Sequence, residues 1–431
     1  MRRRLRCFAL MWPLVHLFLL SNPCSAESPP AFYHLDRIVG PEAAPRLPFE
    51  RPADKEQFVW PTGIAVDSRG DVIVADHRFA YRIANGKAIR ITETGTFQCQ
   101  GMVGHEFIYS PWPGGAGNCW ARGMVAEPDG NILLAHSGFY QVWRMNGAGG
   151  RSVIAGGGTQ SSWGGNSGDN GPALQARLNS PGGVARDSQN NIYIADTGNH
   201  VIRKISPSGI ITRIAGTASA GSGPAAGAAA TATPLHYPFG VAVDVAGNIY
   251  VANTFANNVI RITPGGQAWL FAGGSGAQSS DNDQIPATTA RLTRPVAVAV
   301  SPSGEVYIAE ANRIRKVRDG IISTVAGGPT AGDAGDGGPA TQARLSFPNG
   351  IAFDAAGNLY VADTGNNLVR KIDSKGVITT LAGQRSLEEG ISALEAEFPE
   401  LGGSAIGPDG GLYLTDVLRS SVYRIAPDGR L

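Results

Sequence analysis

Cysteine is scarce in this sequence, and no two cysteines are spaced for a metal site. The chain of 431 residues has four cysteines. No Cys-x-x-Cys pair occurs, which excludes the common zinc-binding frameworks. Two of the four fall within the first 26 residues. The other two, Cys99 and Cys119, lie in one irregular segment, and in an exported chain we expect them to form a local disulfide.

No apolar run is long enough for a transmembrane helix. The longest lies near the N-terminus, where four arginines precede it and Cys24-Ser25-Ala26 offers small residues for cleavage. This arrangement is typical of a secretory signal. We therefore expect a signal peptide at 1–26, a mature chain at 27–431 without a stable membrane span, and a secreted or periplasmic location. Lipidation at Cys24 is the less favoured alternative.

An excess of either charge is also missing. The chain has 36 Lys and Arg against 35 Asp and Glu, and loss of the four signal arginines leaves 32 basic residues and a formal balance of −3. Such a balance gives no electrostatic footprint for nucleic acid or for an anionic membrane. We expect a monomer with no nucleic-acid partner.

Several catalytic signatures are absent as well. No Gly-x-Ser-x-Gly elbow and no paired Cys/His arrangement occurs, which argues against a serine or cysteine nucleophile. Glycine-rich loops such as Gly335-Asp-Gly-Gly-Pro339 are not followed by Gly-Lys-Ser/Thr. They are therefore not phosphate-binding loops.

What the sequence does have is a pattern repeated seven times. Each copy has a small residue at its opening, a turn seven positions later and, with one histidine as an exception, an acid or amide thirteen positions after the opening. The openings are Gly63, Gly123, Gly183, Gly240, Ala297, Gly350 and Gly403. The thirteenth positions are Asp76, His136, Asp196, Asn253, Glu310, Asp363 and Asp416. Neither interval varies, which indicates a repeat protein.

Each copy is expected to form one blade of a β-propeller. The runs are rich in Val, Ile and Tyr and are bounded by Gly, Asn, Asp and Pro, which predicts four short antiparallel strands. The fold class is therefore all-β, with seven blades predicted and six as the alternative. The last copy lacks a fourth strand, and we expect Leu35–Gly40 to complete it and close the ring. Pro and Ala after the loop glycines predict a short helical turn.

The phrase Pro348-Asn-Gly-Ile-Ala-Phe-Asp-Ala-Ala-Gly-Asn-Leu-Tyr-Val-Ala-Asp-Thr-Gly-Asn366 closely resembles the NHL repeat. The third and fourth copies match it equally well, and the resemblance covers essentially the whole mature chain. It implies a β-propeller in which the first strand of each blade lines a central channel, commonly with six blades. Members range from protein- or RNA-binding modules to enzymes, so the resemblance implies a fold rather than a function.

The thirteenth positions are expected to form a ring on the face that also carries the long loops. Carboxylates in such a ring suit a hard cation, and Asp196, Glu310 and Asp363 are the candidate ligands for Ca²⁺ or Zn²⁺. The alternative, favoured by the recurrence in every copy, is that each carboxylate accepts backbone amides of its own turn. His136 and Asn253 depart from the acidic pattern and are candidate ligand-binding residues.

The residue between Pro and Gly at each opening is expected to face the mouth of the channel. It varies from copy to copy, and Arg122, Phe239 and Asn349 are the candidate recognition residues there. Arg186 breaks the apolar pattern of its first strand. We favour a structural pair with Glu127 of the preceding copy, with ligand binding as the second interpretation.

These features favour an exported scaffold that binds a protein, peptide or glycan at its long-loop face. The alternative is a metal-dependent hydrolase or lyase with its site at the channel mouth. Resemblance to peptide-amidating lyases places His200 at one of their histidines, although the rest of the set is not reproduced. Resemblance to gluconolactonase-like propellers would use Glu310 and Asp363 with Asn253 as metal ligands.

Overall fold

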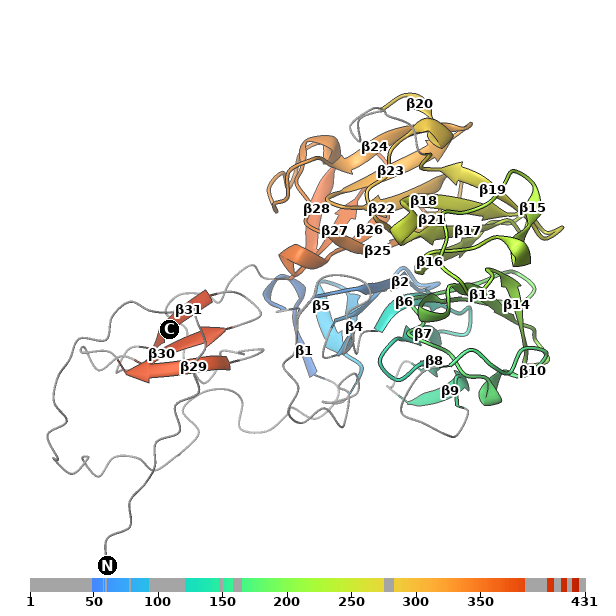
Figure 1. The fold of residues 1–431 in the computed structure, drawn as a ribbon. Helices are drawn as coiled ribbons and strands as arrows, with labels where there is room; N and C mark the ends of the chain where they lie inside the picture. Colours follow the sequence, from blue (N-terminus) through green and yellow to red (C-terminus); the bar gives the residue numbers. More distant parts are fainter. Residues whose placement is uncertain are drawn as a thin grey trace, which may run out of the picture. The chain divides into compact units, whose positions relative to one another are not determined.

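The computed structural model describes residues 49–383, except for 57, 59, 77–78, 93–120, 147–149, 158–164 and 275–282, together with three strands between 401 and 425. This part of the chain is all-β (Figure 1). The predicted signal peptide, the strand predicted at Leu35–Gly40 and the cysteines Cys99 and Cys119 lie outside the described residues. None of the helices in the described part is long and apolar enough to cross a bilayer.

Six antiparallel sheets follow one another along the chain, and we number them blades 1 to 6. Blade 1 contains β2 (Gly63–Val66), β3 (Val72–Ala75), β4 (Ala80–Ala84) and β5 (Lys87–Arg90); blade 2 contains β6 (Ala121–Ala126), β7 (Ile132–His136), β8 (Gln141–Met145) and β9 (Arg151–Ala155). Blade 3 contains β11 (Gly183–Arg186), β12 (Ile192–Asp196), β13 (Val201–Ile205) and β14 (Ile210–Ala215); blade 4 contains β16 (Pro238–Val243), β17 (Ile249–Asn253), β18 (Asn258–Ile262) and β19 (Gln267–Ala272). Blade 5 contains β21 (Pro295–Val300), β22 (Val306–Glu310), β23 (Arg313–Arg318) and β24 (Ile321–Gly327); blade 6 contains β25 (Pro348–Phe353), β26 (Leu359–Asp363), β27 (Leu368–Ile372) and β28 (Ile378–Ala382).

Short elements connect the blades. A short strand pairs with the fourth strand of several blades, as β1 (Phe49–Pro52), β10 (Gly171–Pro172), β15 (Ala228–Ala229) and β20 (Ile285–Pro286). The predicted helical turn follows it and is confirmed as η1 (Ala53–Lys55), η2 (Ala173–Gln175), η4 (Ala230–Ala232), η6 (Ala287–Thr289) and η7 (Ala340–Gln342). A second set of turns follows the second strand, as η3 (Thr197–Asn199), η5 (Thr254–Ala256) and η8 (Thr364–Asn366).

The phrase Asp-x-x-Gly-Asn-x-Tyr of the repeat makes the turn between the first two strands. In blade 3 the Asp187 carboxylate accepts the backbone amide of Asn191 at 2.8 Å, its carboxamide at 2.7 Å and the Tyr193 hydroxyl at 2.9 Å. Asp354 makes the same set of bonds in blade 6. An Asp that accepts nearby amides stabilises a tight turn, so these repeated residues have a structural role.

The blades are held together by apolar side chains on both faces of their strands. The second strands β12, β17 and β26 are buried at every position. The described residues form six apolar clusters, and each cluster joins two consecutive blades. One of them packs Ile64 and Tyr81 of blade 1 against Tyr360 and Val369 of blade 6. Blade 6 is therefore the neighbour of blade 1, and burial of this apolar area supplies most of the driving force for closure.

Polar contacts at the junction between blades 6 and 1 repeat those of the other junctions. The Thr364 hydroxyl donates to Pro61 O at 2.5 Å, as Thr197 does to Pro238 O at 2.6 Å between blades 3 and 4. The Gly383 amide donates to Ala53 O at 3.0 Å. The same bond occurs at three other junctions, from Gly156, Gly216 and Gly273 to the first residue of the following 3₁₀ turn.

The ring therefore closes with six blades, which was the alternative, and the main prediction of seven blades is not confirmed. The seventh copy of the pattern forms a three-stranded sheet of its own, β29 (Leu401–Ile406), β30 (Leu412–Asp416) and β31 (Ser421–Ile425). The predicted completion of that sheet by Leu35–Gly40 lies outside the described residues. Six blades suffice because blade 1 makes with blade 6 the same hydrogen bonds that join the other neighbouring blades.

Six-bladed closure predicts that the seventh copy is dispensable for the ring. We expect a chain that ends after Gly383 to keep the melting temperature of the main transition, because all the described contacts between blades 6 and 1 are retained. Calorimetry of the truncated and full chains tests this. A seven-bladed ring would be opened by the truncation, and loss of the cooperative transition would contradict the closure described above.

Candidate functional site

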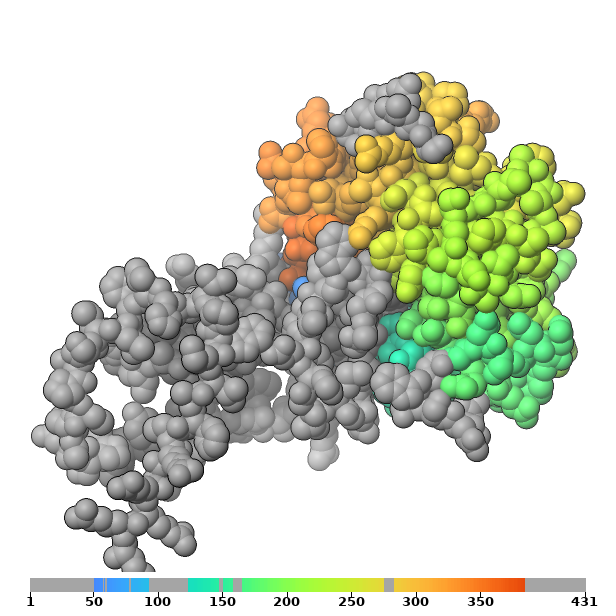
Figure 2. All heavy atoms as spheres, viewed as in Figure 1, coloured from blue at the N-terminus to red at the C-terminus, as the bar shows by residue number. Residues whose placement is uncertain are grey.

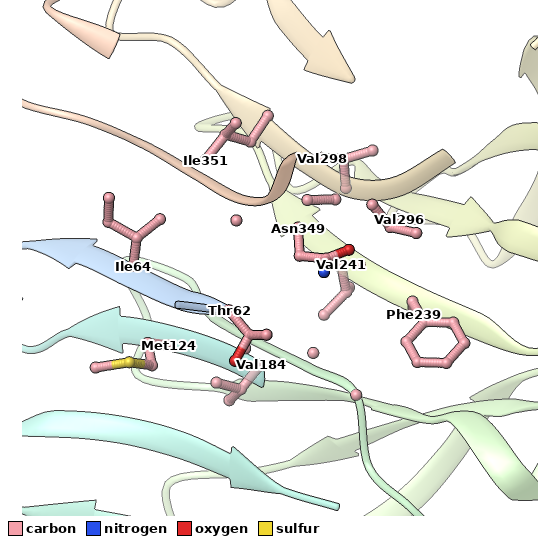
Figure 3. Close-up of a pocket in the computed structure, with 16 residues that line it drawn as sticks. Thr62, Ile64, Met124, Val184, Phe239, Val241, Val296, Val298, Asn349 and Ile351 are labelled. Atoms are coloured by element: carbon pink, nitrogen blue, oxygen red, sulfur yellow. The ribbon is translucent and has the colours of Figure 1, made fainter. Parts of the chain in front are cut away.

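The first strands of the six blades converge on one cavity of about 70 Å³ (Figure 3). Each blade contributes to its wall. The lining residues are Thr62, Ile64, Gly123, Met124, Gly182, Gly183, Val184, Phe239, Gly240, Val241, Val296, Ala297, Val298, Asn349, Gly350 and Ile351. None of these lining side chains is titratable, so the described wall offers hydrogen bonds and apolar contact and no general acid or base.

The predicted mouth residues Phe239 and Asn349 both line this cavity. The Phe239 ring lies over Gly182, where an added Cβ would come within 3.0 Å of the ring. In the described part of the chain the Asn349 carboxamide has no hydrogen-bond partner, and Figure 3 shows it near Thr62 in the same space. The backbone of Arg122 belongs to β6, but its side chain lies outside the described atoms.

A ring of strained residues surrounds this mouth. In five of the six blades a proline precedes the first lining residue, and the residue before that proline has a positive φ; we call these five the rim residues: Trp60 (51°), Ser180 (48°), Tyr237 (49°), Arg294 (50°) and Phe347 (46°). A bulky residue rarely adopts this conformation, which costs about 1–3 kcal/mol and is found most often at functional sites.

At four of the five rim residues the backbone amide donates a hydrogen bond to a side chain of the preceding blade. The Trp60 amide donates to Asn367 Oδ1 at 2.8 Å, and the Arg294 amide donates to Asn257 Oδ1 at 2.8 Å. At the junction of blades 3 and 4 the acceptor is a histidine, since the Tyr237 amide donates to His200 Nδ1 at 3.1 Å. The rim backbone is thus fixed by its amides while the side chains are left for other contacts.

Four aromatic side chains gather at this junction, and we call His200, His236, Tyr237 and Phe255 the junction cluster. The Tyr237 ring meets His200 edge-on at 4.5 Å and Phe255 at 5.1 Å between ring centroids. His236 lies 5.6 Å from Phe255 and 6.0 Å from His200. All four are half-buried. Burial, together with His236, lowers the pKa of His200 below its usual range.

The carboxylates at the thirteenth positions are buried within their own blades. Asp196 is fully buried, and it accepts the Asn179 amide at 2.7 Å and the Asn199 carboxamide at 2.8 Å. Burial raises its pKa to about 7, against these bonds and Arg203, which lower it. Asp363 is bonded in the same way, and burial raises its pKa to about 6.

Glu310 and Asn253 also serve their own blades. Glu310 Oε2 accepts the Thr293 amide, and Oε1 lies 3.0 Å from Arg313 Nε and 3.2 Å from Arg315 Nη1. Asn253 Oδ1 accepts the His236 amide at 2.6 Å. The predicted metal ligands Asp196, Glu310 and Asp363 therefore do not converge. Among the described residues no three possible ligands form a cation site, so these side chains do not fit a shared metal.

The structural interpretation of these carboxylates needs one correction. The main amide donor to Asp196 and Asp363 belongs to the segment that precedes the blade, whereas the expected donor was the Thr-Gly-Asn turn itself. The turn contributes through a side chain instead, from Asn199 or Asn366.

His136 takes the thirteenth position of blade 2 and is completely buried. Its ring lies 4.7 Å from Phe139 and 4.6 Å from Trp143 between centroids, and its Nδ1 accepts the Phe139 amide at 3.2 Å. Burial, with Arg151 nearby, lowers the pKa of His136 to about 3. The imidazole is neutral at physiological pH and lies in the core of its blade.

Three fully buried arginines were missed by the sequence analysis. Arg203 donates to Asp169 Oδ1 at 2.7 Å and lies 3.6 Å from Asp196 Oδ2. Arg370 makes the same pair of contacts with Asp336 and Asp363, and Arg315 does so with Asp283 and Glu310. We call each set an arginine clamp. It fastens the long loop before a blade to the third strand of that blade.

Arg186 pairs as the structural interpretation predicted. Its Nε lies 3.8 Å from Glu127 Oε1 of the preceding blade, and it also donates to Asn190. Glu127 is bonded more closely to Arg144, at 2.6 and 2.9 Å. Arg186 is not among the residues that line the cavity.

Comparison with protein families agrees with this architecture. A family model of the teneurin NHL domain matches residues 129–226 and 328–398. A model of the NHL repeat matches residues 58–79. Both matches overlap the blades described above, and the resemblance to NHL repeats drawn from the sequence is confirmed.

Individual proteins show the same likeness. Human teneurin-1 is 29% identical over 362 residues, which cover 74% of this chain and only 12% of that protein. Bovine NHL repeat-containing protein 2 is 30% identical over 284 residues, which cover 56% of this chain and 38% of that protein. A solved structure of a protein of unknown function from Bacteroides thetaiotaomicron matches with a TM-score of 0.54 at 18% identity, over 75% of this chain and 71% of that chain.

Proposed function

Because the chain is an NHL-repeat β-propeller, we propose that it is an exported binding module that holds a protein, peptide or glycan across the mouth of its channel. The chemistry of the cavity carries this proposal. Its described wall has no titratable side chain. The carboxylates at the thirteenth positions already accept hydrogen bonds from backbone amides or lie in ion pairs with arginines. Such a wall suits recognition better than proton transfer.

The size of the cavity supports a ligand that lies across the mouth. About 70 Å³ is well below the roughly 300–1,000 Å³ of a pocket that encloses a small molecule. A ligand therefore contacts the rim residues and reaches the channel with only a small group. Asn349, whose carboxamide has no partner within the described part of the chain, and Phe239 are positioned to meet that group.

Thermal-shift measurements with soluble peptides and oligosaccharides test this function. We expect a ligand to raise the melting temperature, since binding to the folded state alone adds about 2.7 kcal/mol at 100 times Kd. The shift should be reduced in Asn349→Val, which places in blade 6 the side chain that Val296 has in blade 5. Ile351→Val, which keeps an apolar wall, is the control.

Recovery of the ligand by mass spectrometry separates binding from catalysis. An unchanged ligand supports the binding module. A ligand that is hydrolysed or cleaved would contradict it in favour of the lactonase-like or amidating-lyase-like alternative.

A further inference from the structure

Three positions of the junction cluster, those of His200, His236 and Phe255, differ from the corresponding residues of other blades, and the fourth, Tyr237, stands at a rim position that varies from blade to blade. His200 stands where blades 4 and 6 have Asn257 and Asn367, and Phe255 stands where blades 3 and 6 have Gly198 and Gly365. Likewise, His236 corresponds to Asn179 and Ser346, and Tyr237 corresponds to Ser180.

The scaffold does not need these aromatic side chains. At each position the structural bond of the repeat is made by the backbone or by one ring nitrogen. The His236 amide donates to Asn253 and the Tyr237 amide donates to His200 Nδ1. Asn257 and Asn367 make the corresponding bond through Oδ1. The rings of His236, Tyr237 and Phe255 and the second nitrogen of His200 are therefore surplus to the fold.

The polar tips of the cluster are available to a ligand. Within the part of the chain that the structure describes, His200 Nε2, the Tyr237 hydroxyl and both ring nitrogens of His236 have no hydrogen-bond partner. Neutral imidazole and phenol groups each can donate and accept. His236 and Tyr237 pack against the half-buried Phe255 ring, and the Arg294 guanidinium lies 5.2 Å from the centroid of the same ring.

Resting on the proposed binding function, we infer that the junction cluster is a subsite for one sugar ring of a glycan. A pyranose presents an apolar face of C–H groups, which packs on an aromatic ring, and a rim of hydroxyls, which both donate and accept. The cluster offers aromatic rings for the apolar face of the sugar, and beside them imidazole and phenol groups that can donate hydrogen bonds to its hydroxyls and accept them. Tyr237 lies two residues before Phe239 in the chain, so the subsite adjoins the channel mouth.

The repeat itself supplies matched substitutions. His200→Asn, Tyr237→Ser and Phe255→Gly each insert the residue that another blade has at the same position, so the triple variant is expected to fold. Trp269→Thr is the control, because it replaces an exposed aromatic residue on the fourth strand of blade 4, outside the rim and the junction cluster, with the residue that blades 3 and 6 have there. Circular dichroism and melting temperature verify that all variants are folded.

Calorimetric titration of the full chain tests the inference with neutral oligosaccharides (cellohexaose, chitohexaose, mannohexaose) and an acidic one (trigalacturonic acid). We expect at least one to bind and the triple variant to lose about tenfold in affinity, equivalent to about 1.4 kcal/mol, with no change for Trp269→Thr. Tighter binding of trigalacturonic acid than of the neutral oligosaccharides would indicate that Arg294 contributes to binding through its charge.

Two outcomes would overturn the assignment. If the triple variant binds sugar as the unmodified chain does, the sugar lies elsewhere on the propeller and the binding function stands. If no oligosaccharide binds at millimolar concentration, the sugar subsite is wrong. A peptide whose thermal shift is reduced by Asn349→Val would then still support the binding function, whereas no ligand of either class would count against both.

Discussion

Arg203→Ile is expected to lower the free energy of unfolding by about 3–5 kcal/mol, which is the usual cost of removing one partner from a buried ion pair. Arg203 is fully buried and donates to Asp169 and to two backbone carbonyls, with Asp196 at 3.6 Å. Its loss leaves the Asp196 carboxylate in the core without its cation. Denaturant unfolding of the single variant measures the loss.

Blade 4 provides the control for this prediction. It has Ile260 in place of the arginine, Asn253 in place of the thirteenth-position acid and Ala226 in place of the loop acid. We therefore expect the combination Asp169→Ala, Arg203→Ile and Asp196→Asn to recover most of the lost stability. An arginine clamp that acts as a unit requires this non-additivity. Equal stability of the single and triple variants would show that the charges do not interact as described.

His136 should make a destabilising contribution in mild acid, opposed by Asp196 and Asp363, whose raised pKa values favour the folded state as pH falls. The pKa of this buried histidine is lowered to about 3, whereas it is 6.5 in the unfolded chain. At this residue the unfolded state therefore binds a proton first as pH falls, and the contribution of His136 to folding stability declines from about pH 6.5 towards pH 3. The slope contributed by one such group is at most about 1.4 kcal/mol per pH unit.

His136→Asn isolates this effect. Asparagine occupies the equivalent position in blade 4, where Asn253 accepts an amide through its side chain. The variant should be less stable at neutral pH, because contacts with Phe139 and Trp143 are lost, and its difference in stability from the unmodified chain should shrink as pH falls from 6.5 to 4. His200→Asn, which removes a half-exposed histidine, should keep most of the slope. An unchanged slope in His136→Asn would place the acid sensitivity elsewhere.

The strands and turns could be predicted from the sequence because their bonds are local. The bonds of Asp187 to Asn191 and Tyr193 span six residues at most, so one copy of the pattern contains them all. The number of blades depends on contacts between distant segments, such as Thr364 with Pro61. A count of copies cannot supply those contacts, and the seventh copy accordingly gave a wrong expectation of the ring size.

The candidate site was predicted less completely for the same reason. Asn349 and Phe239 could be placed at the mouth from the spacing of the repeat alone. The arginine clamps had a signal that went unused: the copies with a loop Asp before the blade also have Arg in the third strand, as in Arg203 and Arg370, and blade 4 lacks both. The junction cluster could not be recognised within any one copy of the pattern, because His200 and Tyr237 come from different blades.

The rim residues have a consequence for how this surface can change over time. Their left-handed backbone is enforced by a neighbour's side chain acting on the amide, as for Trp60, Tyr237 and Arg294. Side chains as different as tryptophan, serine and arginine already occupy these positions. β-Branched residues are the most strongly disfavoured at positive φ. A diversified library at the five rim positions could therefore be displayed on an unaltered ring, which makes this propeller a starting point for selecting new binders.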